Sequence, residues 1–307
     1  MKYTAISQTE LSVSAITLGT WVLGGDMWGA ADADQGIASI QAALDAGINM
    51  IDTAPVYGFG RSEEIVGRSL KGRRDKVLIA TKCGLVWSGK NIRTDLSPSS
   101  IKREIDDSLK RLQTDYIDLY QCHWPDPATP IEKSMEALRR LLEQKRIRYV
   151  GVSNFEPDLI RKAAAIVPVV TTQNHYSMLE RSVEKGLLPF CRATDCGLLA
   201  YGPLAGGILT GKYSEEKKFP KGDARSFFYK YYSGEVFAKV RGILDELNSY
   251  NRPLNQIAIN WVRQQPGVAS VIVGSRNPTQ VQANAAAAEW DLTSDQLNAI
   301  TAQLRSL

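Results

Sequence analysis

Short apolar runs alternate with amphipathic segments along the whole chain. The runs are apolar at nearly every position, which is typical of parallel strands that are buried on both faces. The strands predicted from them span residues 14–20, 48–52, 76–82, 116–123, 147–154, 167–174, 197–203 and 268–275. The segments between them repeat their apolar residues every three or four positions, as amphipathic helices do. Those helices span residues 35–47, 61–72, 97–113, 130–144, 157–166, 182–194, 254–265 and 277–288.

Eight strand–helix units in 307 residues predict a (β/α)8 barrel, also called a TIM barrel, within one α/β domain that spans residues 1–307. Residues 2–14 are interpreted as an N-terminal β-hairpin that closes the floor of the barrel. A long loop with weak periodicity, residues 204–233, follows strand seven, and connections of this length are usually functional. A doubly wound sheet is the alternative fold. It needs G-x-G-x-x-G after the first strand, and the segment GTWVLGGDMWG does not contain that motif.

Charge and composition narrow the functional classes. The chain has 37 basic and 33 acidic residues and no long basic block, so a nucleic-acid partner is not indicated. Its four cysteines form no C-x-x-C pair, and its first residues lack the apolar core of a signal peptide. No apolar run approaches the ~20 residues of a membrane span. We therefore expect a cytoplasmic protein with no membrane or obligate protein partner.

Polar side chains gather where the predicted strands end, which is the edge of a (β/α)8 barrel that carries the chemistry. In chain order these residues are Asp52 with Tyr57 just beyond it, Lys82, His123, Ser153 with Asn154, Gln173 with Asn174, Tyr201, and Gly274 with Ser275. Each of them alone has an ordinary structural explanation, such as capping a loop. A carboxylate, a phenol, an amine and an imidazole on three successive strand ends together indicate an active site.

Four segments at these strand ends, IDTAPVYG, ATKCG, LYQCHWPD and GVSNF, resemble the signature segments of the aldo-keto reductase superfamily. The resemblance covers essentially the whole chain and is strongest to the bacterial branch of general-stress and inositol-operon reductases, which is related to potassium-channel β-subunits. It implies an NADP-dependent oxidoreductase that binds NADPH across the barrel mouth and reduces aldehydes and ketones. It also implies a catalytic tetrad of Asp52, Tyr57, Lys82 and His123.

The residue types of this tetrad suit carbonyl reduction, which needs a hydride at carbon and a proton at oxygen. A free tyrosine has a pKa near 10, so it keeps its proton at neutral pH. A neighbouring ammonium lowers that pKa, and we expect Lys82 to do so for Tyr57. Asp52 would orient Lys82, and His123 would hydrogen-bond the substrate carbonyl. Tyr57 is therefore the predicted proton donor, and the hydride comes from the cofactor.

The resemblance also implies where the cofactor would lie. Ser153, Asn154 and Gln173 match positions that bind the nicotinamide carboxamide, whose donor and acceptor they can satisfy. Tyr201 matches the aromatic residue beneath the nicotinamide ring. The segment LAGGILTGK, residues 204–212, resembles the loop that covers the pyrophosphate, with Leu204, Gly206 and Lys212 as its expected contacts.

The opposite end of the cofactor is expected where the last predicted helix begins. Asn277 is a good N-cap and Pro278 suits the first helical position, and a helix N-terminus attracts phosphate. The resemblance implies contacts to the 2′-phosphate and adenine from Gly274, Ser275, Arg276, Gln280 and Asn284. Ala283 is a departure, because many relatives carry a carboxylate or an amide there.

Three tryptophans that follow strand ends, Trp21, Trp87 and Trp124, are interpreted as an apolar wall of the substrate pocket. The long loop would close the other side with the aromatic residues 227–229. The predicted substrates are therefore aromatic or medium-chain aldehydes rather than small hydroxylated sugars.

Two other functions stay open. An NADPH-binding redox sensor or scaffold with weak turnover is compatible with the resemblance to channel β-subunits, although the intact tetrad disfavours it. A metal site could use Asp52, Cys122, His123 and His175. We predict no metal, because the chain has only two histidines and residues 122 and 123 face opposite sides of a strand.

Overall fold

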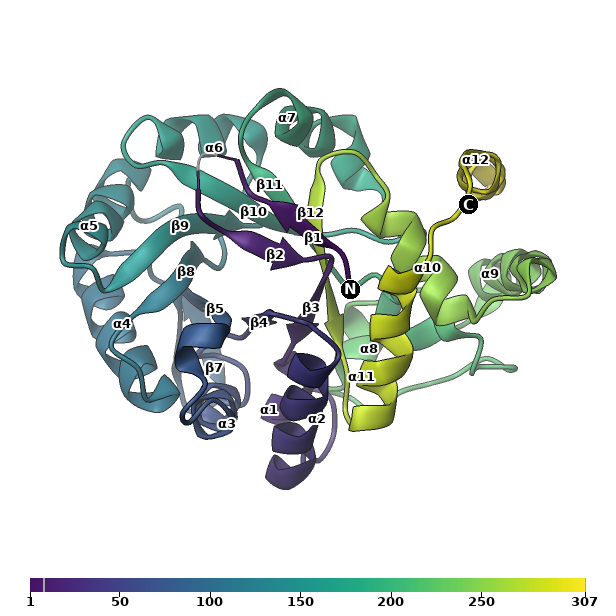
Figure 1. Ribbon diagram of the computed structural model, residues 1–307, viewed down its shortest axis with the longest axis horizontal. Coiled ribbons are helices and arrows are strands. Elements are labelled where there is room, and N and C mark those ends of the chain that lie inside the picture. The colour runs from purple at the N-terminus through teal and green to yellow at the C-terminus, as the bar shows by residue number, and fades with distance from the viewer. Residues whose placement is uncertain (8, 307) are drawn as a thin grey trace.

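Eight parallel strands close into a barrel in the computed structural model, which describes residues 1–7 and 9–306 (Figure 1). The predicted (β/α)8 architecture is confirmed. Around the barrel the strands are β3 (Ile16–Gly19), β4 (Met50–Asp52), β5 (Leu78–Cys83), β8 (Ile117–Cys122), β9 (Ile147–Ser153), β10 (Val169–His175), β11 (Gly197–Tyr201) and β12 (Val268–Gly274). β12 pairs with β3 in parallel register, which closes the ring.

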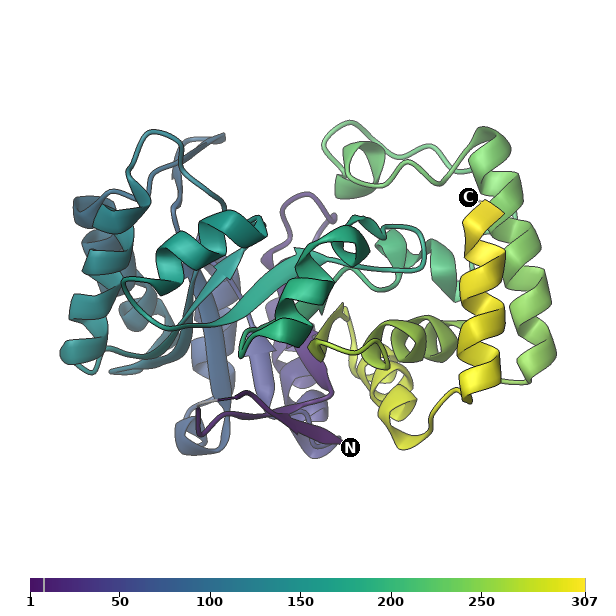
Figure 2. The ribbon, with the colours of Figure 1, turned by 90° about the horizontal axis from the view of Figure 1, so that it is seen from above.

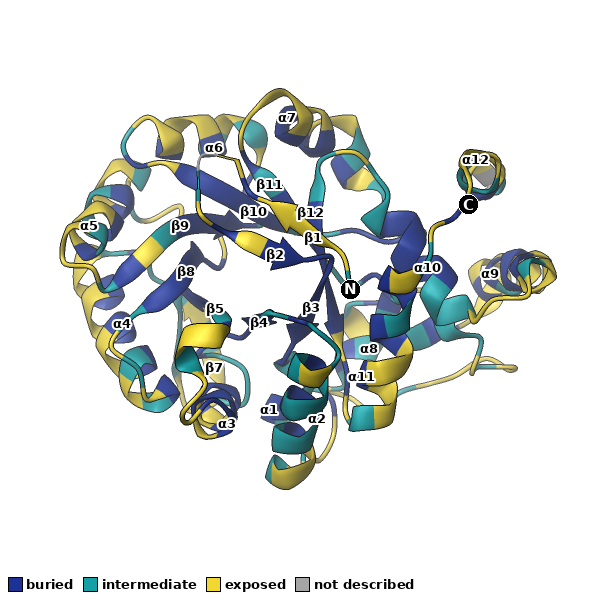
Figure 3. Ribbon diagram, viewed as in Figure 1, coloured by how far each residue is buried: buried dark blue, intermediate teal, exposed yellow. Residues whose placement is uncertain are grey.

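Helices cover the outside of the barrel, and Figure 3 shows buried strands inside helices whose outer faces are exposed. They are α2 (Ala33–Asp45), α3 (Arg61–Ser69), α4 (Pro98–Leu112), α5 (Ile131–Glu143), α6 (Pro157–Ala164), α7 (Leu187–Ala193), α10 (Leu254–Arg263) and α11 (Pro278–Ala285). Helix α4 illustrates the local signals. Ser97 caps its N-terminus through the backbone N–H of Ser100, Pro98 occupies its first turn, and Ile101 and Ile105 are buried on its inner face.

The floor of the barrel is closed by an antiparallel hairpin of β1 (Tyr3–Ala5) and β2 (Ser12–Ser14), as the sequence predicted. Its apolar residues Ile6, Leu11 and Val13 join Met50 and Leu199 in a core cluster inside the barrel. Figure 2 shows this purple hairpin at one end of the barrel and the green segment around α8 (Ala224–Phe227) at the other. The hairpin fills the amino-terminal end of the barrel, opposite the carboxyl ends of the strands.

Several elements lie outside the predicted repeat. A second hairpin, β6 (Leu85–Ser88) and β7 (Asn91–Thr94), follows β5, and helix α9 (Gly234–Leu247) follows the long loop. Helix α12 (Ser294–Gln303) runs beside α9 in Figure 2, and the side chain of Gln303 donates a hydrogen bond to Glu246. Short turns complete the chain: α1 (Trp21–Gly24), η1 (Arg74–Lys76), η2 (Ser182–Lys185), η3 (Ala205–Thr210), η4 (Asn248–Tyr250), η5 (Ala286–Glu289) and η6 (Leu304–Ser306).

Candidate active site

The four predicted catalytic residues meet at the carboxyl ends of β4, β5 and β8. Lys82 Nζ lies 2.9 and 2.8 Å from the two carboxylate oxygens of Asp52 and 3.2 Å from the hydroxyl oxygen of Tyr57. The ring of His123 packs edge-on against the ring of Tyr57, with 5.8 Å between the centroids. Lys82 is fully buried and Asp52 is 2% exposed, so this ion pair is shielded from water. The arrangement couples an ammonium to a phenol that faces the cavity.

The electrostatics of Tyr57 differ from the sequence-based expectation. Burial, and secondarily the negative charge of Asp52, raise the pKa of the Tyr57 phenol well above its usual value. The expected lowering by Lys82 is wrong for this structure, because burial disfavours the phenolate and because Asp52 sits against the ammonium and offsets its charge. The phenol is therefore fully protonated at neutral pH, the state that a proton donor requires.

The other titratable groups of the tetrad are also shifted by burial. Burial lowers the pKa of Lys82, although the charge of Asp52 and its hydrogen bond act in the opposite direction. Burial, together with the charge of Lys82, lowers the pKa of His123 well below its usual value. His123 is therefore a neutral imidazole at neutral pH, which can donate one hydrogen bond to a carbonyl oxygen.

A cavity of about 680 Å³ opens above the tetrad and extends from β8 to α11. Its polar lining includes Asp52, Tyr57, His123, Ser153, Asn154, Gln173, Tyr201, Lys212, Arg225, Asn255, Arg276, Gln280 and Asn284. Gly206 and Gly207 lie on its rim in left-handed conformations that disfavour other residues. A Cβ atom at Gly206 would lie 2.8 Å from the ring of Tyr229. The cavity size suits a small-molecule or cofactor site.

The residues predicted to hold the nicotinamide lie together on one side of this cavity. Asn154 adopts a left-handed backbone (φ 61°), and its side-chain amide donates to the carbonyl oxygen of His123 over 3.1 Å. Its oxygen accepts a hydrogen bond of 3.0 Å from the hydroxyl of Tyr201. The Ser153 hydroxyl donates to the backbone oxygen of Gln173 over 2.8 Å. Tyr201 stacks on His175 with an interplanar angle of 6°, which fixes the orientation of its ring.

The residues predicted to hold the 2′-phosphate lie at the opposite end. Asn277 caps α11 through the backbone N–H of Gln280, as the sequence predicted. The Arg276 side chain lines the cavity and donates to the backbone oxygen of Trp28. Ser275, in contrast, is 2% exposed and accepts a hydrogen bond from Asn284. A helix N-terminus with an adjacent guanidinium is a donor set that fits a phosphate.

The pyrophosphate-covering segment is also part of the cavity wall, because Leu204, Gly206 and Lys212 all line it. Gly274 lines it from the end of β12, where the absence of a side chain leaves room above the strand. Together with the carboxamide and phosphate sets, these residues fit a dinucleotide cofactor. Sixteen of the nineteen predicted site residues line this one cavity, and they come from segments separated by up to 263 positions, from Trp21 to Asn284.

The structure places two of the three predicted tryptophans in the cavity wall and the third outside it. Trp21 stacks on Tyr57, with 5.9 Å between ring centroids, and Trp124 is 40% exposed at the cavity wall. Trp87 is not among the cavity-lining residues and packs instead on Phe59, 5.7 Å away between centroids. It lies in the β6–β7 hairpin, which reaches the cavity through Leu85 and Ile92. The predicted loop residues 227–229 all line the cavity.

Several residues at the cavity were not predicted, among them Gln121 beneath it and Trp28 and Arg225 in its wall. Gln121 lies below the cavity with its amide 3.4 Å from Asp52, and a glutamine within the apolar segment IDLYQC was a signal for it. Trp28 lines the cavity from the loop after α1 and Arg225 from the short helix α8, and the Arg225 guanidinium lies 5.7 Å from the centroid of the Trp28 ring. Neither segment has a periodic pattern, so the sequence offered no comparable signal for the contact.

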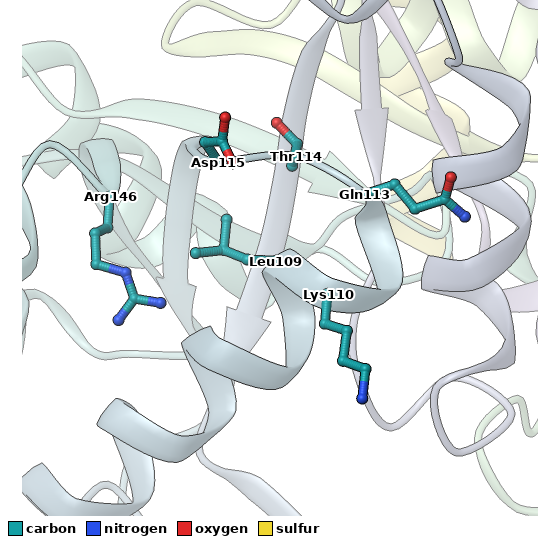
Figure 4. Close-up of a pocket in the computed structure, with 6 residues that line it drawn as sticks. All are labelled: Leu109, Lys110, Gln113, Thr114, Asp115 and Arg146. Atoms are coloured by element: carbon teal, nitrogen blue, oxygen red, sulfur yellow. The ribbon is translucent and has the colours of Figure 1, made fainter.

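A second hollow, shown in Figure 4, lies where α4 runs into β8. Its lining consists of Leu109, Lys110, Gln113, Thr114, Asp115 and Arg146. It lies at the amino-terminal ends of the strands, opposite the tetrad, and it contains no buried charged side chain. In barrels of this kind the amino-terminal face serves stability, so the candidate active site is the cavity above the tetrad.

Residues 1–7 and 9–306 contain neither a metal-binding cluster nor a membrane-spanning helix. No group of three or more His, Cys, Asp or Glu side chains there is arranged to hold a metal ion. No helix in the same part of the chain is long and apolar enough to cross a membrane.

Comparison with known sequences finds relatives along almost the whole chain. The model of the Aldo/keto reductase family matches residues 15–305. The chain is 42% identical to "Aldo-keto reductase YhdN" of Bacillus subtilis, over 96% of this chain and 91% of the relative. It is 35% identical to the "NADH-specific methylglyoxal reductase" of Escherichia coli, over 95% of both chains. It is 33% identical to an Arabidopsis thaliana protein described as "Probable voltage-gated potassium channel subunit beta", over 92% of this chain and 90% of the relative.

Comparison with solved structures agrees with the fold. The chain is similar to the glycerol dehydrogenase AKR11B4 from Gluconobacter oxydans, with a TM-score of 0.92 and 39% sequence identity. That similarity covers 99% of this chain and 95% of the solved chain. The structural similarity therefore extends over almost the full length of the chain, which includes the barrel, its floor hairpin and the loops at its mouth.

Proposed function

The chain belongs to the aldo/keto reductase family of oxidoreductases, and we propose that it is an NADPH-dependent reductase of aldehydes and ketones with Tyr57 as the proton donor. The observation that carries this proposal is the 3.2 Å contact between Lys82 Nζ and the Tyr57 hydroxyl at the base of the cavity. A phenol and an ammonium in contact can deliver a proton and stabilise the phenolate that remains.

The chain's own residues have separate tasks in this proposal. Tyr57 holds its proton until negative charge develops on the substrate carbonyl oxygen, because its pKa is raised in the resting site. Lys82 then lies close enough to stabilise the phenolate, while Asp52 keeps the ammonium in place. His123, neutral and beside Tyr57, is placed to donate a hydrogen bond to the same carbonyl oxygen. NADPH, when bound, supplies the hydride.

The preference for NADPH rests on the phosphate end of the cavity. Arg276 and the N-terminus of α11 form a cationic, hydrogen-bonding set that matches a 2′-phosphate. Arg225 lies close enough that its charge lowers the pKa of Arg276, after the larger effect of burial, although Asp223, which is paired with Arg225 at 2.6 Å, acts in the opposite direction. The E. coli relative is described as NADH-specific, so the cofactor choice is tested directly rather than taken from the family.

The proposed substrates are small carbonyl compounds with an apolar tail. The walls around Tyr57 are formed by Trp21, Trp124 and Phe228, with Leu85 and Ile92 from the β6–β7 hairpin. Burial of apolar surface stabilises a bound tail by about 25 cal/mol per Å². Aromatic and medium-chain aldehydes can use this surface, whereas a small sugar would leave its hydroxyl groups without partners against it.

The test is the consumption of NADPH with an aromatic aldehyde, with a series of linear aldehydes and with a sugar, and each assay is repeated with NADH. We expect rapid turnover of the apolar aldehydes with NADPH and slower turnover with NADH. Tight NADPH binding without measurable turnover across the series would contradict a reductase and would favour the sensor or scaffold. Turnover with NADH alone would overturn the cofactor assignment and leave the reductase in place.

A further inference from the structure

The Asp52 carboxylate has hydrogen-bond partners outside the tetrad. Besides Lys82, Asp52 Oδ1 accepts a hydrogen bond of 2.8 Å from Gln173 Nε2 and a longer one of 3.4 Å from Gln121 Nε2. Gln173 Nε2 also lies 3.4 Å from Gln121 Oε1, so the two amides contact each other. Gln121 is fully buried and Gln173 is 3% exposed. Asp52 is therefore surrounded by one ammonium and two amides.

The chemistry of these groups fixes the orientation of both amides. An ionised carboxylate only accepts hydrogen bonds, so each glutamine must turn its NH2 group toward Asp52. Gln173 then donates one hydrogen to Asp52 and the other to Gln121 Oε1. Its own Oε1 has no hydrogen-bond partner among the described residues, and Gln173 lines the cavity. Gln173 consequently offers the cavity an acceptor rather than a donor.

Gly151, on the neighbouring strand, leaves room in the barrel for the Gln121 side chain. Gln121 lies between Lys82 and Gly151 in the strand register. A Cβ atom at Gly151 would lie 3.0 Å from Gln121 Cγ and 2.5 Å from Thr171 Oγ1. Because Gly151 has no side chain, the Gln121 side chain can cross the barrel interior toward Asp52. The glycine and the glutamine thus form a matched pair on adjacent strands.

We propose that Gln121 is a positioning residue of the reaction, which acts through Asp52 and Gln173 without touching the substrate. Its amide donates a hydrogen bond to Asp52. This hydrogen bond stabilises the carboxylate whose negative charge holds Lys82 against Tyr57. Its oxygen holds the amide of Gln173 in the orientation that presents Oε1 to the cavity. This inference rests on the proposed carbonyl reductase activity.

Four charged or titratable side chains surround Asp52 among the described residues: Lys82, Tyr57, His123 and Glu63. Lys82 contacts Asp52 directly, and Tyr57 contacts Lys82. His123, at the end of β8, packs against the ring of Tyr57. Glu63 of α3 acts on Lys82 from behind, and its own carboxylate is paired with Arg111 at 2.7 Å. Gln121 and Gln173 contact Asp52 and do not titrate, so a carboxylate introduced at position 121 changes the charge around Asp52 directly.

Two variants separate the tasks of the Gln121 amide. Gln121→Met keeps the length of the side chain and removes both hydrogen bonds, so kcat should fall about tenfold, the scale of one lost hydrogen bond to a charged group. Gln121→Glu keeps an oxygen for Gln173 but places a carboxylate beside Asp52. It should lose about 100-fold or more in kcat/KM at pH 8, because two adjacent carboxylates repel.

The pH dependence distinguishes positioning from a structural role. As the pH falls, the pair formed by Asp52 and the new glutamate takes up a shared proton, which restores a donor to Asp52. The ratio of Gln121→Glu to wild-type kcat/KM should therefore rise as the pH is lowered from 8 to 6. Without cofactor, the difference in unfolding temperature between wild type and Gln121→Glu should shrink as the pH is lowered over the same range. NADPH affinity, measured by fluorescence titration, should stay within about threefold of wild type for the glutamate variant, which retains the acceptor for Gln173.

Thr171→Val is the matched control, because Thr171 is fully buried in the same register row, on the other side of Gly151, and its Oγ1 has no hydrogen-bond partner among the described residues. That variant should keep the wild-type kcat and pH profile. The inference is overturned if Gln121→Met matches wild type, or if the Gln121→Glu ratio is flat with pH. If the wild-type protein itself reduces no carbonyl compound, the proposed function has failed, and the unfolding temperatures still decide whether Gln121 supports Asp52.

Discussion

The base of the cavity and its walls are built in different ways. The base consists of strand-end side chains such as Asp52 and Lys82, which are 2% and 0% exposed and joined by short hydrogen bonds. The walls consist of side chains from loops and short helices, such as Phe227 and Trp124, which are 53% and 40% exposed, and Trp21 and Phe228, which pack edge to face on each other. The difference teaches that reactive groups are fixed on a rigid scaffold while selectivity is left to loops that can vary.

The base should be far more sensitive to single substitutions than the walls. Lys82→Met leaves Asp52 buried without its cation and should lower the free energy of unfolding by about 3–5 kcal/mol. Lys212→Met, at an exposed wall position, should change it by less than about 0.5 kcal/mol. Urea unfolding of both variants measures the contrast. Equal, small losses in the two would show that the Asp52–Lys82 pair contributes no more than a surface charge.

A second buried carboxyl group near the base sharpens the contrast, because it lacks a cation in contact. Glu104 accepts hydrogen bonds of 3.1 Å from the Gly84 N–H and from the Ser100 hydroxyl. Burial raises the pKa of Glu104 from 4.5 to about 7. The folded state therefore binds this proton more tightly, and its stabilisation, about 3 kcal/mol at most, is present below pH 4.5 and lost as the pH rises to about 7.

Glu104→Gln should remove that slope. Urea unfolding at several pH values between 4.5 and 8 measures it, with the wild-type protein as the reference. A wild-type unfolding free energy that does not fall across this range, relative to the variant, would contradict the raised pKa of Glu104.

The phosphate end of the wall should matter for one cofactor and not for the other. Arg276→Ala should weaken NADPH binding by about 1.5–3 kcal/mol, the scale of a hydrogen bond to a charged group. NADH lacks the 2′-phosphate and should barely respond. Fluorescence titration of both cofactors gives the comparison, and equal losses would remove Arg276 from the 2′-phosphate site.

The smallest effects are expected at the tryptophans of the wall. In a series of linear aldehydes, log(kcat/KM) should rise with chain length, and each well-buried methylene contributes up to about 0.8 kcal/mol. Trp21→Ala and Trp124→Ala should flatten that rise, whereas Trp87→Ala should not, because Trp87 packs on Phe59 outside the cavity. A rise that survives in the first two variants would place the apolar tail elsewhere.

Much of the barrel could be predicted because its signals are local. Apolar runs and helical spacing define the repeat, and Ser97 with Pro98 marks the start of α4. The β6–β7 hairpin and α9 were missed because they interrupt the repeat. Helix α9 nevertheless carries a signal in the spacing of Phe237, Val240 and Leu244, which are buried on one face.

The site divides in the same way between local and three-dimensional information. The meeting of Asp52, Lys82 and His123 could be predicted because strand order brings three successive strand ends together, and the resemblance to aldo-keto reductases implied that they form a tetrad with Tyr57. The raised pKa of Tyr57 could not, since its sign depends on burial and on the balance between Asp52 and Lys82. The exclusion of Trp87 from the cavity likewise depends on how its hairpin folds over Phe59. Residue types thus indicate the chemistry, and distances decide which side chains take part.

The role of Tyr57 as proton donor is the central claim, and one substitution tests it most directly. The measurement is the steady-state reduction of an aromatic aldehyde with NADPH by wild type, Tyr57→Phe and the control Tyr116→Phe, together with NADPH affinity by fluorescence titration. Tyr116 lies at the opposite end of β8, away from the cavity. We predict that Tyr57→Phe loses about 10²–10⁴-fold in kcat and keeps its NADPH affinity, while Tyr116→Phe is unchanged. Near-wild-type turnover by Tyr57→Phe would contradict the account.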